Sequence, residues 1–146
     1  MVKLVIQRVV KAKVTVEGKS VGQIDEGLLV LVGVGKSDSE KEANFLAQKL
    51  SKLRILADAK KKMNLSTIDK KASILAVSQF TLFADTSKGN RPSFVRAAGP
   101  KKAEKLYEFF VEELRNLGLK VETGMFGEYM DIETWLDGPV TIILES

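Results

Sequence analysis

Hydroxyl, amide and basic side chains gather in one stretch of the sequence, from Ser78 to Arg96. The stretch begins as an apolar strand and continues as a polar loop, an arrangement in which a rigid element presents adaptable groups to a ligand. The chain contains no histidine and no cysteine. Any chemistry must therefore proceed without an imidazole base, a thiolate nucleophile or the usual zinc ligands.

The candidate nucleophiles are the hydroxyls of Ser78, Thr81 and Thr141, which lie at strand positions that could share a cleft. A hydroxyl needs a neighbouring base to attack a carbonyl. No basic or acidic residue adjoins Ser78 or Thr81, and the spacing to Lys88 is not diagnostic of a Ser–Lys pair. Hydroxyls in strands commonly make local hydrogen bonds instead, so a structural role stays open for each of them.

Backbone groups offer a second kind of chemistry. A strand that ends in a sharp turn can point N–H groups at an oxyanion, which assists acyl transfer without a titrating side chain. Gln79 and the N–H of Phe80 stand at such a strand end. Gly138-Pro139 is a second unusual backbone site, because glycine frees the chain, proline lacks a donor and X-Pro bonds can be cis. Its alternative interpretation is an ordinary turn before an edge strand.

Metal and dinucleotide sites are not indicated. The acids Glu128, Asp131, Glu133 and Asp137 match no metal-binding spacing, so we interpret them as a solvated acidic face and expect no metal and no cofactor. Gly33-x-Gly35 lacks the third glycine of a dinucleotide-binding fingerprint.

Charge is distributed unevenly along this chain, whose net charge is +4. Residues 86–105 carry six cations against the single anion Glu104, whereas residues 121–146 carry six acids and no lysine or arginine. A basic sector favours a phosphate-bearing partner. Ordinary solvated lysines explain the same charges equally well, so charge alone leaves both interpretations open.

Hydrophobic periodicity predicts one α+β (α/β) domain over residues 1–146. Its sheet is mostly antiparallel and barrel-like, with two main helices. The helices begin at the capping signals around Ser39 and at Gly99-Pro100, and end near Arg54 and at Gly118. We expect strands over 2–16, 20–24, 28–34, 72–83, 119–122, 129–134 and 140–144, an extended 55–57 and a basic loop over 60–64.

The two helices could cover one face of this sheet, which would leave the other face for a partner and makes a dimer plausible. No apolar run approaches the roughly 18 residues that span a bilayer. The N-terminal alternation is that of a strand and not of a signal peptide, so we expect a cytoplasmic protein without a membrane partner.

Two motifs carry a family resemblance. Ser78-Gln-Phe-Thr-Leu82, taken together with Gly138-Pro-Val-Thr141, resembles the two signature motifs of D-aminoacyl-tRNA deacylases. Further segments resemble the family in order and cover nearly the whole chain: Ile6–Val9, Ala12–Val14, Gly27–Gly33, Lys62–Asn64, Lys88–Phe94 and Thr123–Phe126.

The resemblance implies a homodimer whose active sites lie at the subunit interface. The reaction would be hydrolysis of the ester between a D-amino acid and the 3′ end of tRNA, and also removal of glycine misattached to non-glycine tRNAs. Gly138-Pro139 would be a cis-proline motif lent to the partner's site, where its carbonyls crowd the place of an L side chain. Such a filter works by rejection, and glycine passes it because glycine has no side chain.

By the same resemblance, the Phe80 N–H would bind the oxyanion, Ser78 and Gln79 would shape the pocket, and the 2′-hydroxyl of the substrate would assist. Thr81 would position the substrate rather than attack it. The implied residues for substrate binding and chiral selection are Arg8, Phe126, Met130, Gly138, Pro139, Val140 and Thr141, with Arg8 tethering the Gly-Pro loop. The residues implied to meet tRNA phosphates are Lys60, Lys61, Lys62, Lys88, Arg91 and Arg96, and no DNA partner is expected.

The chain departs from the family pattern at two positions. Leu136 stands where the motif usually has asparagine, and Glu128 stands where the family tends to carry a small residue. Both departures bear on specificity rather than on the reaction. Two other functions remain as alternatives: a non-catalytic tRNA- or RNA-binding module, and a general Ser/Thr esterase that uses Thr81 or Ser78.

Overall fold

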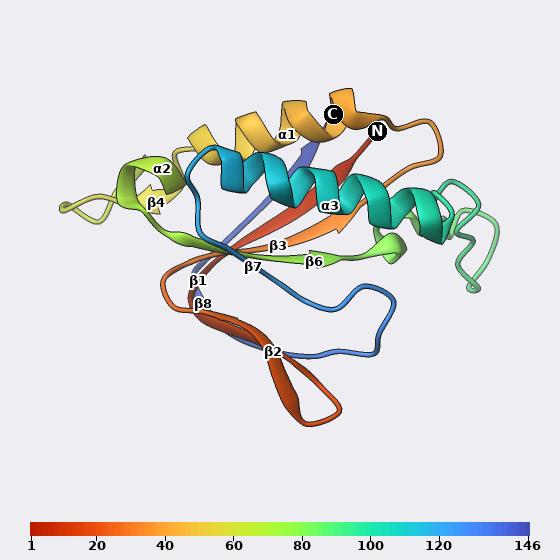
Figure 1. The fold of residues 1–146 in the computed structure, drawn as a ribbon, viewed down its shortest axis with the longest axis horizontal. Coiled ribbons are helices and arrows are strands. Elements are labelled where there is room, and N and C mark those ends of the chain that lie inside the picture. The colour runs from red at the N-terminus through yellow and green to blue at the C-terminus, as the bar shows by residue number, and fades with distance from the viewer.

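The computed structural model describes all residues from Met1 to Ser146 and is built around a six-stranded mixed sheet (Figure 1). In chain order the strands are β1 (Lys3–Val16), β2 (Lys19–Ile24), β3 (Gly27–Gly33), β4 (Leu56–Ala57), β5 (Met63–Leu65), β6 (Ser73–Ser78), β7 (Val121–Thr123) and β8 (Asp131–Glu145). The helices are α1 (Glu40–Lys52), α2 (Thr67–Lys70) and α3 (Pro100–Asn116), with a single 3₁₀ turn, η1 (Phe80–Phe83).

Strand β1 organises the sheet because it pairs along both of its edges. It runs antiparallel to β3 and β2 on one edge and to β8 on the other. Strand β6 lies parallel to β3, and β7 lies parallel to β6. The short strands β4 and β5 form a separate antiparallel hairpin.

Both long helices cover the same face of the sheet (Figure 1). Helix α1 begins with a capping box, in which the Ser39 hydroxyl accepts from the N–H of Lys41 and Glu42 accepts from the N–H of Ser39. Pro100 occupies the first turn of α3, where its missing N–H costs no hydrogen bond. The apolar faces of both helices and of the sheet form a main core of 21 buried residues.

The opposite face of the sheet curls around a smaller core of seven buried residues: Val9, Ala12, Val14, Ile24, Leu29, Leu75 and Val77. The curl brings the backbone of Gly22 and Gly27 so close to neighbouring segments that no side chain would fit at these two positions. A Cβ on Gly27 would lie 1.8 Å from the carbonyl oxygen of Ser73, and one on Gly22 would lie 2.3 Å from that of Thr123. The predicted fold class, a barrel-like sheet with two main helices, is confirmed.

The strand predicted over residues 72–83 is wrong at its C-terminal end. Strand β6 stops at Ser78, and residues 80–83 form η1. The chain leaves the sheet at Gln79, whose N–H makes a last bond of 2.8 Å to the carbonyl of Val32. The turn then buries Phe83 against the end of β3, where Gly33 and Gly35 have no side chains. A run of apolar residues alone could not reveal this change of direction.

The C-terminal strands were also predicted incorrectly. Residues 131–145 form one continuous strand, β8, that passes through Gly138-Pro139 instead of ending before it. Leu136 pairs with Val9 and Thr141 pairs with Gln7, so residues 137–140 stand opposite Arg8 alone. The strand accommodates its proline in this bulge, which is how sheets commonly tolerate a residue without an N–H.

The sequence did not predict helix α2, strand β5 or the two parallel strand pairs. Helix α2 has its own capping box between Ser66 and Asp69. None of the helices combines the length and the apolar character needed to cross a membrane.

Candidate functional site

A cavity of about 730 Å³ opens where β6 ends. Its walls come from β6 and η1, from the start of α3 and from the segment that leads into β8. Most of its lining is apolar, with Ser78, Gln79, Glu128 and Tyr129 as the polar exceptions. Of the predicted site residues, it brings together Ser78, Gln79, Phe80, Phe126 and Met130.

Turn η1 presents backbone N–H groups beside this cavity. The first N–H groups of a helical turn have no acceptor within it, and Phe80 and Thr81 occupy these positions in η1. The hydrogen bonds of the turn itself come from later residues: the N–H of Leu82 donates to the Gln79 carbonyl, and the N–H of Ala84 donates to the Thr81 carbonyl. No side chain caps the turn. The turn's own hydrogen bonds therefore do not use the N–H of Phe80, a residue that lines the cavity.

The hydroxyls near the cavity have no base beside them. The Thr81 hydroxyl accepts a bond of 2.6 Å from the side-chain amide of Gln79. No lysine amine and no carboxylate is hydrogen-bonded to Ser78 or Thr81. Thr141 lies elsewhere, where its hydroxyl accepts from the Gln7 amide at 3.5 Å. This geometry favours a positioning role for the hydroxyls over covalent attack.

The loop after η1 closes over one side of the cavity. Asp85 and Ser93 exchange two backbone hydrogen bonds of 2.9 Å. The N–H of Ser87 donates to the Asp85 carboxylate, and this bond lowers the pKa of Asp85 below its usual value. The loop also delivers Phe94, whose ring meets Phe80 edge-on at 5.0 Å between centroids. Phe80 is thus held at the cavity mouth by an aromatic contact.

The Gly138-Pro139 motif lies on the bulge of β8, and its peptide bond is cis. The Arg8 side chain, only 12% exposed, fills the space beneath the bulge. Its Nε donates to the Asp137 carbonyl at 3.2 Å and lies equally close to the Asp137 carboxylate. Its Nη1 donates to the carbonyl of Ile55 at 3.0 Å. Arg8 therefore ties the bulge to the segment that follows α1.

The two signature motifs do not meet within one chain. Arg8, which lies opposite the bulge, pairs with Leu28 in β3, whereas Ser78 pairs with Val32. The bulge and Ser78 are separated by three strand spacings across the sheet and four residues along it, roughly 20 Å. Gly138, Pro139, Val140, Thr141 and Arg8 do not line the cavity.

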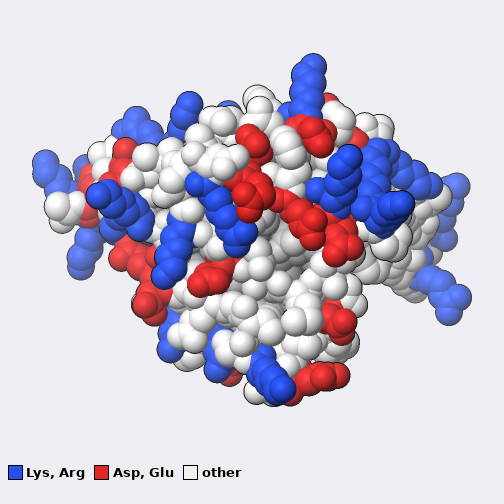
Figure 2. Space-filling view, viewed as in Figure 1, with Lys and Arg blue, Asp and Glu red and all other residues white.

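The predicted phosphate-binding residues fall into two groups at opposite ends of the molecule. Lys60, Lys61 and Lys62 lie in the hairpin between β4 and β5, and the other three lie in the loop between η1 and α3 (Figure 1). Figure 2 shows basic side chains gathered at both ends. The N–H groups of Lys62 and Lys60 both donate to Asp58, which lowers the pKa of Asp58 and holds the hairpin in one shape.

Sequence reasoning missed two residues that support the site. A Cβ on Gly33 would lie 3.2 Å from the Gln79 carbonyl oxygen, so this glycine gives η1 its place against β3. The buried Tyr107 hydroxyl donates to the Ala76 carbonyl at 2.8 Å, two residues before Ser78. Burial raises the pKa of Tyr107 well above its usual value. The helical spacing of apolar residues in α3 predicts that Tyr107 is buried, but it does not reveal that the Tyr107 hydroxyl forms a hydrogen bond with β6.

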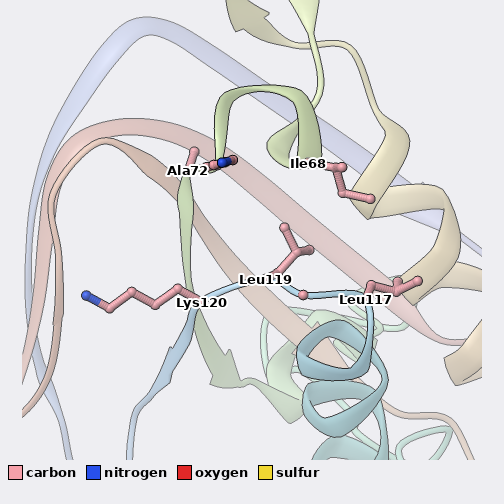
Figure 3. A pocket seen from close by; sticks show the side chains of 7 residues that line it. Ile68, Ala72, Leu117, Leu119 and Lys120 are labelled. Atoms are coloured by element: carbon pink, nitrogen blue, oxygen red, sulfur yellow. The ribbon is translucent and has the colours of Figure 1, made fainter.

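A second hollow, of about 350 Å³, lies at the other end of α3 and has no part in this site. Figure 3 shows Ile68, Leu117 and Leu119 around it, with the Lys120 side chain extending away from them. The structure contains no group of three or more acidic side chains that could hold a metal ion.

Comparison with known proteins assigns the chain to a family. The family model described as D-Tyr-tRNA(Tyr) deacylase matches residues 5–145. The chain belongs to the D-Tyr-tRNA(Tyr) deacylase family. A D-aminoacyl-tRNA deacylase of Koribacter versatilis is 55% identical over 142 residues, which are 97% of this chain and 95% of the relative. The corresponding protein of Brevibacillus brevis is 54% identical over 144 residues, 99% of each chain.

Two solved structures share the fold of this chain. The structure of a c-Myc DNA Unwinding Element Binding Protein superposes with a TM-score of 0.92 at 42% identity and covers 99% of this chain and 98% of that chain. A structure described as "a probable eukaryotic D-amino acid tRNA deacylase" superposes with a TM-score of 0.87 over 99% of each chain. At 17% identity, the second likeness concerns the fold alone.

Proposed function

We propose that this protein hydrolyses the ester bond of D-aminoacyl-tRNA and releases the free D-amino acid and tRNA. The observation that carries the proposal is the family match over residues 5–145, within which the Ser78–Thr81 motif stands at a cavity. The relatives that match over almost the whole chain are named D-aminoacyl-tRNA deacylases.

The proposed reaction needs no titrating side chain. A water molecule attacks the ester carbonyl carbon, and the N–H of Phe80 donates to the oxygen that becomes negative. The tetrahedral intermediate then collapses, the bond from carbon to the ribose 3′-oxygen breaks, and that oxygen takes up the proton that water lost. The neighbouring 2′-hydroxyl relays this proton. The absence of histidine from the chain is therefore compatible with catalysis.

Side chains around the turn then have positioning roles. Ser78 and Gln79 shape the cavity wall, and the Gln79 amide holds the Thr81 hydroxyl. Phe126 and Met130 supply apolar walls on the opposite side. A volume of about 730 Å³ exceeds the need of an amino acid alone and falls in the range of drug-sized ligands, so the terminal nucleoside can enter with the ester.

Chiral selection requires a second copy of the chain in this proposal. Because Gly138-Pro139 lies roughly 20 Å from Ser78 within one chain, the motif acts on the cavity of a partner. In that position the Gly138 and Pro139 carbonyls crowd the place of an L side chain, with Val140 and Thr141 beside them. D-aminoacyl esters pass, and so does glycine misattached to a non-cognate tRNA.

Exposed apolar side chains on β1 and β8 support a homodimer. They are Val10, Ile132, Trp135, Leu136 and Ile143, with exposures from 38% to 65%. Exposed apolar groups gathered on two neighbouring strands are typical of protein interaction sites. Leu136, which replaces the asparagine of the motif, adds apolar surface here, while Asp137 and Arg8 hold the bulge in place.

A non-catalytic binding module is the second candidate, because a relative at 42% identity is named for binding a DNA element. Turnover separates the two functions. The protein, at a hundredth of the substrate concentration, is mixed with D-tyrosyl-tRNA, and free tyrosine is measured over time. An enzyme releases far more tyrosine than there are protein molecules, whereas a binding module protects the ester.

The role of the 2′-hydroxyl has its own test. A tRNA that ends in 2′-deoxyadenosine should be a very poor substrate. Rapid hydrolysis of that substrate would contradict the relay, and a trapped acyl-enzyme would favour the esterase alternative through Thr81 or Ser78.

A further inference from the structure

A basic surface beside the cavity takes no part in the site described above. It consists of Lys36 from the β3–α1 connection and Lys101, Lys102 and Lys105 from the first turns of α3, and it is called the α3-end surface below. All four side chains are exposed, and none forms an ion pair. Figure 2 shows the blue atoms gathered where α3 begins in Figure 1.

This surface is continuous with the rim of the cavity. The Lys102 ammonium donates to the Lys36 carbonyl at 2.5 Å, and the N–H of Lys36 donates to the Arg96 carbonyl at 3.1 Å. On the other side of the same helical turn, Pro100 and Ala103 line the cavity. Because a helix with its side chains is about 10 Å across, the lysines lie about that distance from the cavity.

The two rims of the cavity differ in charge. Glu128 is the one acid in the cavity lining, which contains no lysine or arginine, whereas the exposed acids Asp131 and Glu133 flank Ile132 in β8 and lie on the strand face away from the cavity. A polyanion whose end enters the cavity is repelled by Glu128 and attracted by the lysines of the α3-end surface. Charge complementarity therefore selects the direction in which a nucleic acid would leave the cavity.

We propose that the α3-end surface binds the backbone phosphates of the tRNA acceptor end, while the terminal aminoacyl nucleoside occupies the cavity. This inference rests on the proposed function and adds to it the path of the RNA. Lysine ammonium groups suit phosphate contacts that carry no sequence information, so the surface positions any acceptor end regardless of its bases.

The test neutralises three lysines and compares two substrates. The variant is Lys36→Gln/Lys101→Gln/Lys105→Gln, with Lys102 retained because its ammonium bonds the Lys36 carbonyl. The matched control is Lys49→Gln/Lys52→Gln/Lys120→Gln, which removes three exposed lysines at the other end of the helices. The substrates are D-tyrosyl-tRNA and 3′-O-D-tyrosyl-adenosine, which has no phosphate.

For D-tyrosyl-tRNA we expect the variant to raise KM about tenfold and leave kcat unchanged. The slope of log KM against log salt should fall by about 2 to 3, which is about 0.7 to 0.9 for each lost phosphate contact. With 3′-O-D-tyrosyl-adenosine the variant should match the wild type. The control should match the wild type with both substrates.

Several outcomes would overturn the proposal: an unchanged KM for the tRNA, an equal loss with both substrates, or an equal loss in the control. Equal competition by a DNA duplex of the same length would also do so, by showing a general polyanion surface. If the wild type hydrolyses neither substrate, the proposed function fails separately. Filter binding of uncharged tRNA to the variant and the control then decides the role of the surface.

Discussion

Replacing Gly33 by alanine should disturb turn η1, to which we assign the oxyanion donor, more than the fold. Gly33 ends β3 directly beneath η1. An added Cβ would lie 3.1 Å from the Leu82 Cβ, 3.2 Å from the Gln79 carbonyl oxygen and 3.2 Å from the Phe83 ring. All three atoms belong to the segment that carries the Phe80 N–H. Since carbon atoms prefer separations of about 3.5–4.0 Å, this segment must move away by a few tenths of an ångström.

The expected cost has two parts. Overpacking of this kind destabilises a protein by about 1–3 kcal/mol, which lowers Tm by roughly 4 °C for each kcal/mol in a chain of this size. The catalytic part follows from the displaced donor, because a misplacement of about 1 Å can cost a hundredfold in rate. For a few tenths of an ångström we expect kcat for D-tyrosyl-tRNA to fall about tenfold, with KM little changed.

Gly35→Ala provides the matched control. The atoms nearest to its Cβ would be those of the Asp38 carboxylate at 3.1 Å and the Phe83 ring at 3.2 Å, whereas the Cβ of Gly33→Ala also meets the Gln79 carbonyl oxygen. The Tm of the control should fall by an amount similar to that of Gly33→Ala, while its kcat should stay within about twofold of the wild-type value. Steady-state kinetics of both variants at 25 °C, together with thermal unfolding, make the comparison. A wild-type kcat in Gly33→Ala would refute the reasoning, as would equal losses of kcat in the two variants.

Three further predictions concern the bulge, the support of β6 and pH. Gly138→Ala should abolish deacylation of D-tyrosyl-tRNA while the chain stays folded, because Gly138 has φ +130° and its Cβ would lie 2.8 Å from the Val140 nitrogen; retained activity would show that the motif does not act in the site. Tyr107→Phe should lower the free energy of unfolding by about 1 kcal/mol by leaving the Ala76 carbonyl one partner short, as chemical denaturation can measure. Activity should show no imidazole inflection between pH 6 and 8. Stability should be constant there and fall only below about pH 4, because carboxylates with lowered pKa stabilise the folded state above their unfolded pKa and lose that contribution on protonation. The carboxylates with a lowered pKa are those of Glu42, Asp58, Asp69 and Asp85. A Tm that drops between pH 8 and 6 would contradict the assignment of the pH-dependent stability to these four acids.

Elements with a local signal were predictable from the sequence. The Ser39–Glu42 capping box and the apolar stripe that follows it predicted α1, and Pro100 with Gly118 delimited α3. In each case the residues that determine where the helix begins and ends lie in or next to the helix itself, so a short stretch of sequence is enough to predict it. The buried strand β3 was recognisable for the same reason, since both of its faces are apolar.

Features that depend on distant partners were not predictable. Strand β6 ends because the Gln79 N–H bonds Val32 and Phe83 packs on Gly33, which lies more than forty residues earlier in the chain. Strand β8 continues past Pro139 because Arg8 of β1 fills its bulge. The candidate site shows the same limit: the residues of both motifs were recognised, but only the register of four strands reveals that one chain holds them far apart.

If this chain is a chiral deacylase, as we propose, it must distinguish D-tyrosyl-tRNA from L-tyrosyl-tRNA when the hydrolysis of both is measured side by side. With catalytic amounts of protein, kcat/KM for the D ester should exceed that for the L ester by at least about a hundredfold, or about 2.7 kcal/mol. Comparable release from both esters would contradict chiral selection and indicate a general esterase. Release from neither, with tRNA bound, would contradict catalysis and indicate a binding module.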